Sequence, residues 1–435
     1  MNPLELDRTS LLVVIVSLVT DELKALRHQS SHQIGSERWS ASTLVGEVQD
    51  TSLLQPGQMA IGADSLELVS LATCVATFFN IYDSGLEDYL LRFKTLGEWS
   101  ELVEAARERG SRNITFATSG STGTPKQCLQ RWDSLAGETG FFASHLGPDA
   151  KQPAARIIAL SPCHHIYGFI FSVLLPAHLN LPVIRGAKAL SVVQRGKLEA
   201  GDLIIGFPFI WQQLSRQGAQ FPPGVTGITS TGPCDPSIIR ELRDQGLDRM
   251  VEVYGSSETA GIGFRDDPQA AFRLLPRWIR CQSPHALADS DNGEEYQLSD
   301  NLDWADQFHL RPAGRRDEAV QVGGINVFPA NIAERLQNLP DVAAAAVRLM
   351  APDEGVRLKA FIVPDTKQHD RESFEARLHA WCARNLSAAE RPKSFTFGSQ
   401  LPCNAMGKQS DWPIGTEAAS REPFGDHNAG PGPLA

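Results

Sequence analysis

Thr118-Ser-Gly-Ser-Thr-Gly-Thr-Pro-Lys126 is the stretch of this 435-residue sequence on which its interpretation depends. It follows residues 114–117, whose β-branched and aromatic side chains are typical of a short strand. Gly120 and Gly123 permit backbone angles that other residues avoid, so successive N–H groups can face an anion, and Lys126 adds a positive charge. Hydroxyl groups add further donors at Ser119, Ser121, Thr122 and Thr124. Such a stretch is either a phosphate-binding loop or an ordinary polar turn, and the rest of the sequence must decide.

Further segments favour the phosphate-binding loop. They are Tyr254-Gly-Ser-Ser-Glu-Thr259, Leu298-Ser-Asp300 with Gly314-Arg-Arg-Asp317, Val322-Gly-Gly-Ile-Asn-Val327 and Leu401-Pro-Cys-Asn-Ala-Met-Gly-Lys408. Together with the first stretch they resemble, in order and spacing, the motifs of the adenylate-forming (AMP-binding) superfamily of acyl- and aryl-CoA synthetases. The resemblance covers about residues 114–412. A polar turn alone does not account for five motifs in this order.

The resemblance implies an α/β fold with several domains. An adenylate-forming synthetase core is expected over residues 111–313, followed by a small mobile C-terminal α/β lid domain over residues 314–412. Short β-rich runs such as residues 156–160, 225–229 and 250–254 alternate with helical stretches, as parallel strands in an α/β domain do. Residues 413–435, rich in Gly, Pro and polar types, are predicted to be a disordered tail.

The resemblance also implies an activity. Members of the superfamily join a carboxylic acid to AMP, release pyrophosphate, and pass the acyl group to a thiol. The chain is therefore expected to use ATP and Mg²⁺ to activate an aryl or acyl acid and to transfer it to CoA or to an acyl carrier protein. Gly255-Ser-Ser-Glu-Thr-Ala-Gly-Ile-Gly-Phe-Arg265 is similar to synthetases of aryl-polyene pigment pathways, which suggests a hydroxybenzoate-like acid. The alternative is a catalytically degenerate AMP-binding scaffold in a pigment or lipid biosynthesis complex.

Each motif residue acquires an expected role from the same resemblance. The loop from Thr118 to Lys126 holds the β- and γ-phosphates. The expected catalytic residues are Lys408, which bridges carboxylate and α-phosphate, Glu258, which binds Mg²⁺, and His165, which borders the acyl pocket. The other assignments are adenine contacts at Gly232, Pro233 and Tyr254, ribose contacts at Asp300 and Arg315, a hinge at Asp317, and a thiol channel at Gly323 and Gly324.

The first 110 residues show a second resemblance. Gly62-Ala-Asp-Ser-Leu-Glu-Leu68 and Phe79 are similar to the second helix of an acyl carrier protein, in which Ser65 would carry phosphopantetheine. Helical patterns at residues 10–27, 65–79 and 95–107 predict an all-helical, carrier-like domain over residues 1–110. Two alternatives stay open. Asp64 and Ser65 can simply cap a helix, or the segment is a shortened remnant of the synthetase's own N-terminal subdomain.

Composition excludes several other classes. The net charge of −11 disfavours nucleic acid as a partner, because binding phosphates requires clustered Lys and Arg. The seven cysteines contain no C-x-x-C pair, which favours free thiols in the reducing cytoplasm over a zinc site or a disulfide framework. The longest apolar run, residues 11–19, is too short to span a bilayer, so no integral membrane association is expected.

Overall fold

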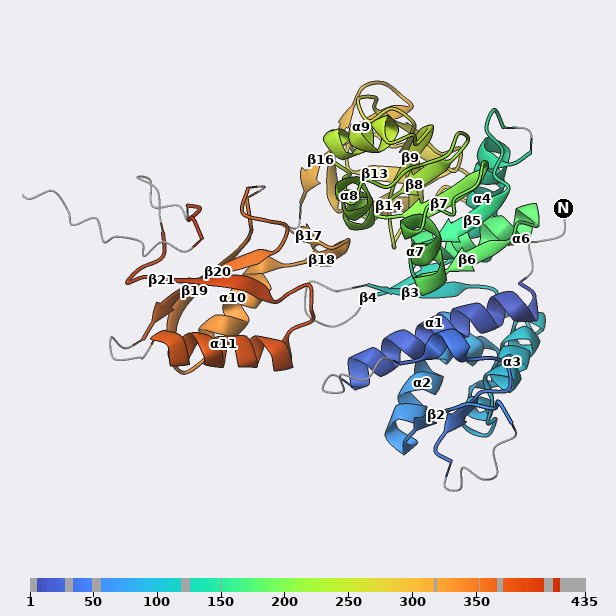
Figure 1. Ribbon diagram of the computed structural model, residues 1–435, viewed down its shortest axis with the longest axis horizontal. Helices are drawn as coiled ribbons and strands as arrows, with labels where there is room; N and C mark the ends of the chain where they lie inside the picture. Colours follow the sequence, from blue (N-terminus) through green and yellow to red (C-terminus); the bar gives the residue numbers. More distant parts are fainter. Residues whose placement is uncertain are drawn as a thin grey trace, which may run out of the picture. The chain divides into compact units, whose positions relative to one another are not determined.

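The computed structural model describes residues 6–27, 34–48, 56–118, 126–148, 150–316, 319–351, 353–365, 371–402 and 410–414. The chain forms two compact units, Met1–Asp317 and Glu318–Ala435, which are drawn in Figure 1. The predicted tail at residues 413–435 lies almost wholly outside the described residues. In the part of the chain that is described, no helix is both long enough and apolar enough to cross a membrane, and the cysteines there are free.

Three helices form the start of the first unit, as predicted: α1 (Arg8–Leu26), α2 (Ser65–Phe78) and α3 (Leu96–Glu108). α1 packs against both of the others (Figure 1). Side chains begin each helix, because Asp7, Asp64 and Thr95 accept backbone N–H groups of the first turn. Asp64 and Thr95 each form a full capping box with a glutamate three residues later. Short helices link them: η1 (Ser36–Arg38), η3 (Ile81–Ser84) and η4 (Glu87–Leu91).

The segment is not all-helical, contrary to the prediction. Strands β1 (Leu44–Gly46) and β2 (Ala60–Ala63) pair in parallel within it. Nor does it have a core of its own, because its helices share one hydrophobic core with the strands that follow. Phe78 of α2 lies 5.3 Å from Phe116 and 5.8 Å from Phe169, measured between ring centroids. A free-standing carrier domain would bury these side chains among its own helices.

A nine-stranded sheet organises the rest of the first unit, in the order β15-β16-β11-β10-β9-β8-β7-β5-β6. Neighbouring strands from β9 to β6 run parallel, and the others antiparallel. The parallel strands are β5 (Arg156–Ala159), β6 (Val183–Arg185), β7 (Asp202–Gly206), β8 (Thr226–Thr229) and β9 (Arg249–Ser256). The antiparallel ones are β10 (Ala260–Arg265), β11 (Phe272–Leu274), β15 (Asp300–Trp304) and β16 (His309–Arg315). A separate small sheet contains β12 (Trp278–Arg280), β13 (Ala286–Asp289) and β14 (Glu295–Gln297).

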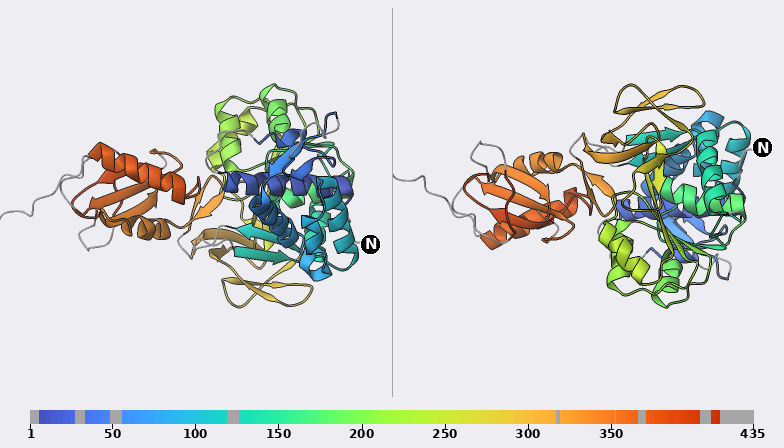
Figure 2. Two further views of the ribbon diagram at one scale, coloured as in Figure 1. Left: turned by 90° about the horizontal axis from the view of Figure 1, so that it is seen from below. Right: turned by 90° about the horizontal axis from the view of Figure 1, so that it is seen from above.

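Both faces of the parallel strands are buried, because alternate side chains enter different cores. Ile204 packs in a core with α7 (Gly186–Gln194), α8 (Pro208–Arg216) and α9 (Pro236–Asp244). Its neighbours Leu203 and Ile205 enter the core shared with α1 to α3 and α4 (Trp132–Leu146). Figure 2 shows the helices on the two sides of the sheet. This second side also contains α5 (Ile166–Phe169), the π-helix η5 (Ile170–Leu174) and α6 (Leu175–Leu179).

Residues 114–118 form a strand, as predicted, but in another sheet. β3 (Ile114–Thr118) pairs antiparallel with β4 (Lys126–Gln130), and the two make a separate two-stranded sheet. The register places Thr118 opposite Lys126, so both ends of the glycine-rich stretch emerge side by side.

The second unit is a small α/β domain, as predicted. Its sheet consists of β19 (Val342–Leu349), β20 (Leu358–Pro364) and β21 (Pro392–Phe397), packed with α10 (Pro329–Gln337) and α11 (Arg371–Asn385). β17 (Val320–Val322) and β18 (Ile325–Val327) form a hairpin whose two-residue turn is Gly323-Gly324. Both glycines have positive φ, 61° and 83°, which is the conformation that a tight hairpin turn of this kind requires.

Candidate active site

The predicted site residues of the first unit gather where its parallel strands end. His165 follows β5, Gly232 and Pro233 follow β8, and Tyr254 lies near the end of β9. From β5 the chain passes to β6 on one side and then crosses to β7 on the other, so the strand order reverses beside β5. In open parallel sheets, ligands bind outside the carboxyl ends of the strands at such a reversal. The topology therefore supports a ligand site at this edge.

Lys126 and Glu258 form an ion pair across 132 residues of sequence. Lys126 Nζ donates to Glu258 Oε1 at 2.9 Å, and the two side chains are 58% and 35% exposed. The bond to Glu258 raises the pKa of Lys126. Burial would raise the pKa of Glu258, but the hydrogen bond from Lys126 and its positive charge outweigh burial and lower it. Glu258 is therefore an ionised carboxylate that remains open to solvent beside the end of the glycine-rich stretch.

Side chains from other elements hold the turn that contains Glu258 by hydrogen bonds to its backbone. Gln130 Nε2 donates to the carbonyl oxygens of Ser257 at 2.6 Å and Glu258 at 2.9 Å. Glu138 of α4 accepts the N–H of Gly261 at 2.9 Å. Glu138 has almost no exposed surface, and this burial raises the pKa of its carboxyl to about 7. Backbone contacts of this kind fix the direction of the Glu258 side chain without occupying its carboxylate.

Tyr254, Asp300 and Arg315 come together although they lie on three different strands. The Tyr254 hydroxyl donates to Asp300 Oδ2 at 2.6 Å, and Arg315 Nη1 lies 3.7 Å from Asp300 Oδ1. Burial and the Asp300 charge raise the pKa of Tyr254 well above its ordinary value, so the phenol stays protonated and donates. Asp300 thus presents a carboxylate whose position is defined from two sides.

His165 lies in a segment that is fastened to the sheet by the next residues. Two carbonyl oxygens, those of Gly206 and Ile228, lie 2.8 Å from the buried Tyr167 hydroxyl. His165 has an exposed edge, but surrounding protein and the charge that His164 can carry lower its pKa to about 4. Its imidazole is therefore neutral near pH 7 and can accept or donate a hydrogen bond.

α1 supports this segment through His164. Ser17 Oγ lies 2.7 Å from His164 Nδ1, and Asp21 Oδ2 lies 3.5 Å from His164 Nε2. The interaction with His164 lowers the pKa of Asp21. Ser17 and Asp21 are one helical turn apart, so one face of α1 contacts both ring nitrogens.

Several predicted site residues cannot be placed. Lys408, Asp317 and residues 119–124 lie outside the described residues, and Thr118 is described only as the last backbone position of β3. Gly323 and Gly324 belong to the second unit.

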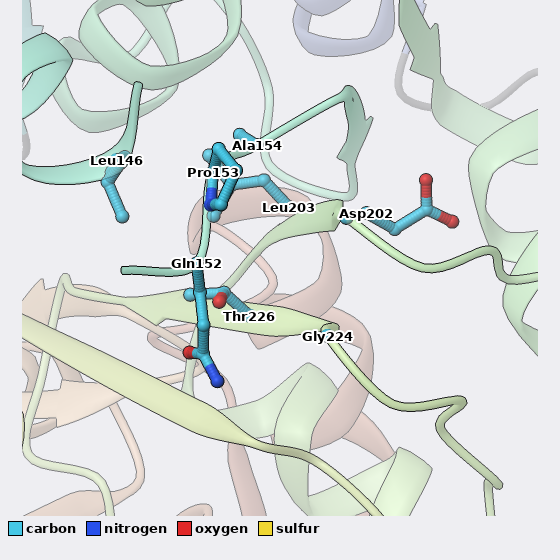
Figure 3. A pocket seen from close by; sticks show the side chains of 9 residues that line it. Leu146, Gln152, Pro153, Ala154, Asp202, Leu203, Gly224 and Thr226 are labelled. Carbon is cyan, nitrogen blue, oxygen red and sulfur yellow. The ribbon is translucent and has the colours of Figure 1, made fainter. Parts of the chain in front are cut away.

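A recess at the opposite end of the sheet takes no part in this arrangement. It is lined near the amino ends of β7 and β8 by residues such as Gln152, Asp202 and Thr226 (Figure 3). The Asp202 carboxylate is occupied by Arg156, with Nη2 2.7 Å from Oδ2. The predicted site residues follow the carboxyl ends of the strands instead.

Comparisons with known proteins agree with this geometry. Residues 94–292 match the family model described as AMP-binding enzyme, and residues 331–408 match that of the AMP-binding enzyme C-terminal domain. A 4-coumarate–CoA ligase of Halorhodospira halophila is 39% identical over 350 residues, which cover 80% of this chain and 88% of that protein. The chain belongs to the AMP-binding enzyme family. The predicted activity is thereby confirmed at the level of an ATP-dependent, AMP-forming ligase that joins a carboxylic acid to a thiol.

A second relative extends the match of this AMP-binding enzyme toward its N-terminus. A 4-coumarate–CoA ligase of Cereibacter sphaeroides is 35% identical over 413 residues, or 94% of this chain and 97% of that protein. The match is too long to leave the first 110 residues outside it. This supports the interpretation that the segment belongs to the synthetase, and it does not support an added carrier protein or an aryl-polyene relationship.

Solved structures resemble the AMP-binding enzyme in fold. An o-succinylbenzoate CoA synthetase from Bacillus subtilis has a TM-score of 0.56 at 18% identity and covers 92% of this chain and 91% of its own. An amide bond synthetase from Marinactinospora thermotolerans has a TM-score of 0.57 at 16% identity, with 92% of both chains covered. These similarities confirm the α/β adenylate-forming fold.

Sequence patterns alone missed the residues that support the motifs. Gln130 and Glu138 lie just after the glycine-rich stretch, but nothing near them in the sequence reveals that they contact residues 257–261. Tyr167 lies two residues after His165, and no local pattern marks it as an anchor. A polar side chain in an apolar helical stretch, such as Glu138 in α4, is the one signal that could have identified such a residue.

Proposed function

We propose that this AMP-binding enzyme is a ligase of 4-hydroxyaryl acids of the 4-coumarate type, with CoA as acceptor. Three relatives named 4-coumarate–CoA ligase, at 35–39% identity, support this proposal, and one of them is matched over 97% of its length. The single structural observation that carries the activity is that the carboxyl end of β9 and the turn after it bring together two pairs, Tyr254 with Asp300 and Glu258 with Lys126. A degenerate scaffold would not need to preserve this constellation.

The proposed roles follow from charge and position. The stretch 118–126 binds the β- and γ-phosphates of ATP, and Lys126 moves from Glu258 to a phosphate oxygen. Asp300 accepts the ribose hydroxyls, with Arg315 assisting, while Gly232, Pro233 and Tyr254 contact the adenine. These groups position and stabilise charge rather than form bonds, as the transfer of phosphorus groups requires.

Glu258 is the proposed Mg²⁺ ligand. No group of three or more His, Cys, Asp or Glu side chains in the described parts of the chain could hold a metal. Mg²⁺ bound to a nucleotide needs only one or two carboxylates, because phosphates and water supply its other ligands. The solvent-accessible, ionised Glu258 fits that requirement. When bound, Mg²⁺ neutralises phosphate charge.

The remaining roles concern the two half-reactions. Lys408 is proposed to contact the carboxylate and the α-phosphate during adenylation. Asp317 is proposed as the hinge of the lid, which brings Gly323 and Gly324 to the thiol channel in the second step. The neutral His165 is proposed to border the acyl group.

Tyr254→Phe tests the ribose side of this assignment. The variant keeps the ring but removes the donor to Asp300, so we expect the KM for ATP to rise about tenfold with a smaller change in kcat. Initial rates at varied ATP measure this. Tyr296→Phe is the matched control. Tyr296 lies on β14, and its hydroxyl donates to Glu294 at 3.2 Å and not to Asp300. Equal effects of the two substitutions would contradict the role of Tyr254.

The modification of Ser65 that the carrier-protein interpretation predicts is untested. In the structure Asp64 has a role without pantetheine, because it accepts the N–H groups of Leu66 and Glu67. Ser65 is exposed. Intact mass after incubation with CoA and a phosphopantetheinyl transferase decides the matter. We expect no added pantetheine, and a gain that Ser65→Ala abolishes would restore the carrier interpretation.

The proposed function is tested by two assays with a panel of aryl and fatty acids. ATP–pyrophosphate exchange reports adenylation, and thioester formation with CoA reports the second step. We expect 4-coumarate to be the best substrate in both assays. Exchange with fatty acids but not with aryl acids would overturn the substrate class, and exchange without CoA thioester would overturn the acceptor.

A further inference from the structure

Arg185 ends the edge strand of the parallel sheet beside the His165 segment. Its Cα pairs with that of Ala159, the last residue of β5, after which the chain enters residues 160–165. One guanidinium nitrogen, Nη2, donates to the carbonyl oxygen of Ser172 in the π-helix that follows His165. Burial raises the pKa of the nearby Cys163 thiol, and the positive charge of Arg185 opposes that rise. The guanidinium thus lies against the segment proposed to border the acyl group.

This guanidinium has no counter-charge among the described residues. Its Nε is buried without a hydrogen-bond partner, and no carboxylate acts on its charge. Burial lowers the pKa of Arg185. A buried cationic N–H group without a partner is costly, so an acceptor that binds beside it would be favoured.

Three other arginines of the same unit have carboxylate partners. The guanidinium groups of Arg156, Arg265 and Arg277, which are 12–19% exposed, each contact a buried carboxylate. Their partners are Asp202, Glu252 and Asp289, at 2.7, 2.9 and 3.0 Å. These three arginines each have a buried carboxylate partner, whereas no carboxylate of the described residues contacts Arg185.

We propose that Arg185 binds the oxygen at the far end of the acid substrate and selects acids that carry a 4-hydroxyl group. This inference rests on the proposed function, because it needs the acyl group to lie along the His165 segment. The nucleotide residues Tyr254 and Glu258 lie on β9 and on the turn after it, whereas Arg185 ends β6, the opposite edge of the parallel strands. The reacting carboxylate faces the nucleotide, so the ring oxygen points toward β6.

The chemistry of the guanidinium defines what it recognises. Its N–H groups donate to a phenol or phenolate oxygen, and its charge favours the phenolate. A second carboxylate at the far end of the acid would satisfy the same requirement. We assign the phenol oxygen because the relatives named 4-coumarate–CoA ligase match this chain over most of its length. A site built to bind a substrate hydroxyl discriminates strongly against the analogue that lacks it.

Adenylation kinetics with paired acids test this assignment. The acids are 4-coumarate and cinnamate, which differ only in the hydroxyl. The proteins are wild type, Arg185→Met, Arg185→Lys and the control Arg195→Met, in which the replaced residue is exposed just after α7. We expect Arg185→Met to lower kcat/KM for 4-coumarate by about 10–100-fold and to change that for cinnamate by less than about twofold. Arg185→Lys should restore part of the preference.

Absorption spectra of bound 4-coumarate give a second readout, which would not change if Arg185 had only a structural role. In the wild type the phenolate band should appear at lower pH than for the free acid, and Arg185→Met should remove that shift. An equal loss with both acids, or no change in their ratio, would overturn the assignment. A preference for 4-carboxycinnamate over 4-coumarate that depends on Arg185 would also overturn the assignment, because the site would then bind a second carboxylate. Wild-type enzyme that activates neither 4-coumarate nor cinnamate would reject the proposed function itself.

Discussion

Lys408→Ala is expected to lower ATP–pyrophosphate exchange by about 10²–10³-fold, the usual effect of removing one positioned donor from a charged transition state. The ammonium group is proposed to neutralise charge on the attacking carboxylate and the α-phosphate together. Thioester formation from a preformed acyl-adenylate should be nearly unchanged, because that step does not break the bond to pyrophosphate. The half-reactions are measured separately, by exchange and by single-turnover thioester formation.

The described residues on either side of the segment that contains Lys408 are themselves held by hydrogen bonds. Ser410 N–H donates to the carbonyl oxygen of Pro402 at 2.8 Å. Lys359, which is fully buried, donates to Asp411 and to the carbonyl oxygen of Trp412, at 3.2 and 2.6 Å.

A matched control for Lys408→Ala lies in the same unit. Lys393→Ala removes an exposed lysine of β21 and should leave both half-reactions unchanged. If Lys408→Ala slowed both half-reactions equally, or neither of them, the proposed role of Lys408 in adenylation would be wrong.

Glu138→Gln is expected to stabilise the first unit above neutral pH. Burial raises the pKa of Glu138 from the ordinary 4.5 to about 7 in the folded chain. Between these values the folded chain binds the proton more tightly than the unfolded chain, so stability rises as the pH falls from about 7 to 4.5 and is constant below that range. At higher pH the ionised, buried carboxylate costs about 3 kcal/mol.

Glutamine is neutral at every pH and can still accept the Gly261 N–H. The variant should therefore lose this pH dependence and gain up to about 3 kcal/mol in the free energy of unfolding at pH 8, measured by urea unfolding at pH 5 and pH 8. Glu37→Gln, at an exposed position, should match the wild type at both pH values. A wild-type protein that is equally stable at both pH values would show that Glu138 does not titrate in this range.

The motifs that identify the family could be recognised in the sequence because each is a short run with its own chemistry. Tyr254 and Glu258 lie four residues apart on one strand and turn, and the pattern that identifies them needs no knowledge of the fold. The three N-terminal helices were also predictable, since their caps and apolar spacing are local. The carrier-like interpretation went further than such signals allow. Asp64-Ser65-Leu66 is equally suited to begin a helix. The contacts that distinguish a carrier domain from a part of the synthetase are those of Phe78 with the distant residues Phe116 and Phe169.

By itself, then, the sequence determined the family, the order of the motifs and the chemical character of the groups that we propose to bind ATP, because these depend on residue type and local spacing. Only the tertiary structure decided that Lys126 pairs with Glu258, that Glu138 holds Gly261 from α4, and that no carboxylate of the described residues lies beside Arg185. These facts depend on contacts between residues that are more than 100 positions apart, or on the lack of a contact. Such contacts are set by how the sheet and helices pack, and no local pattern encodes them.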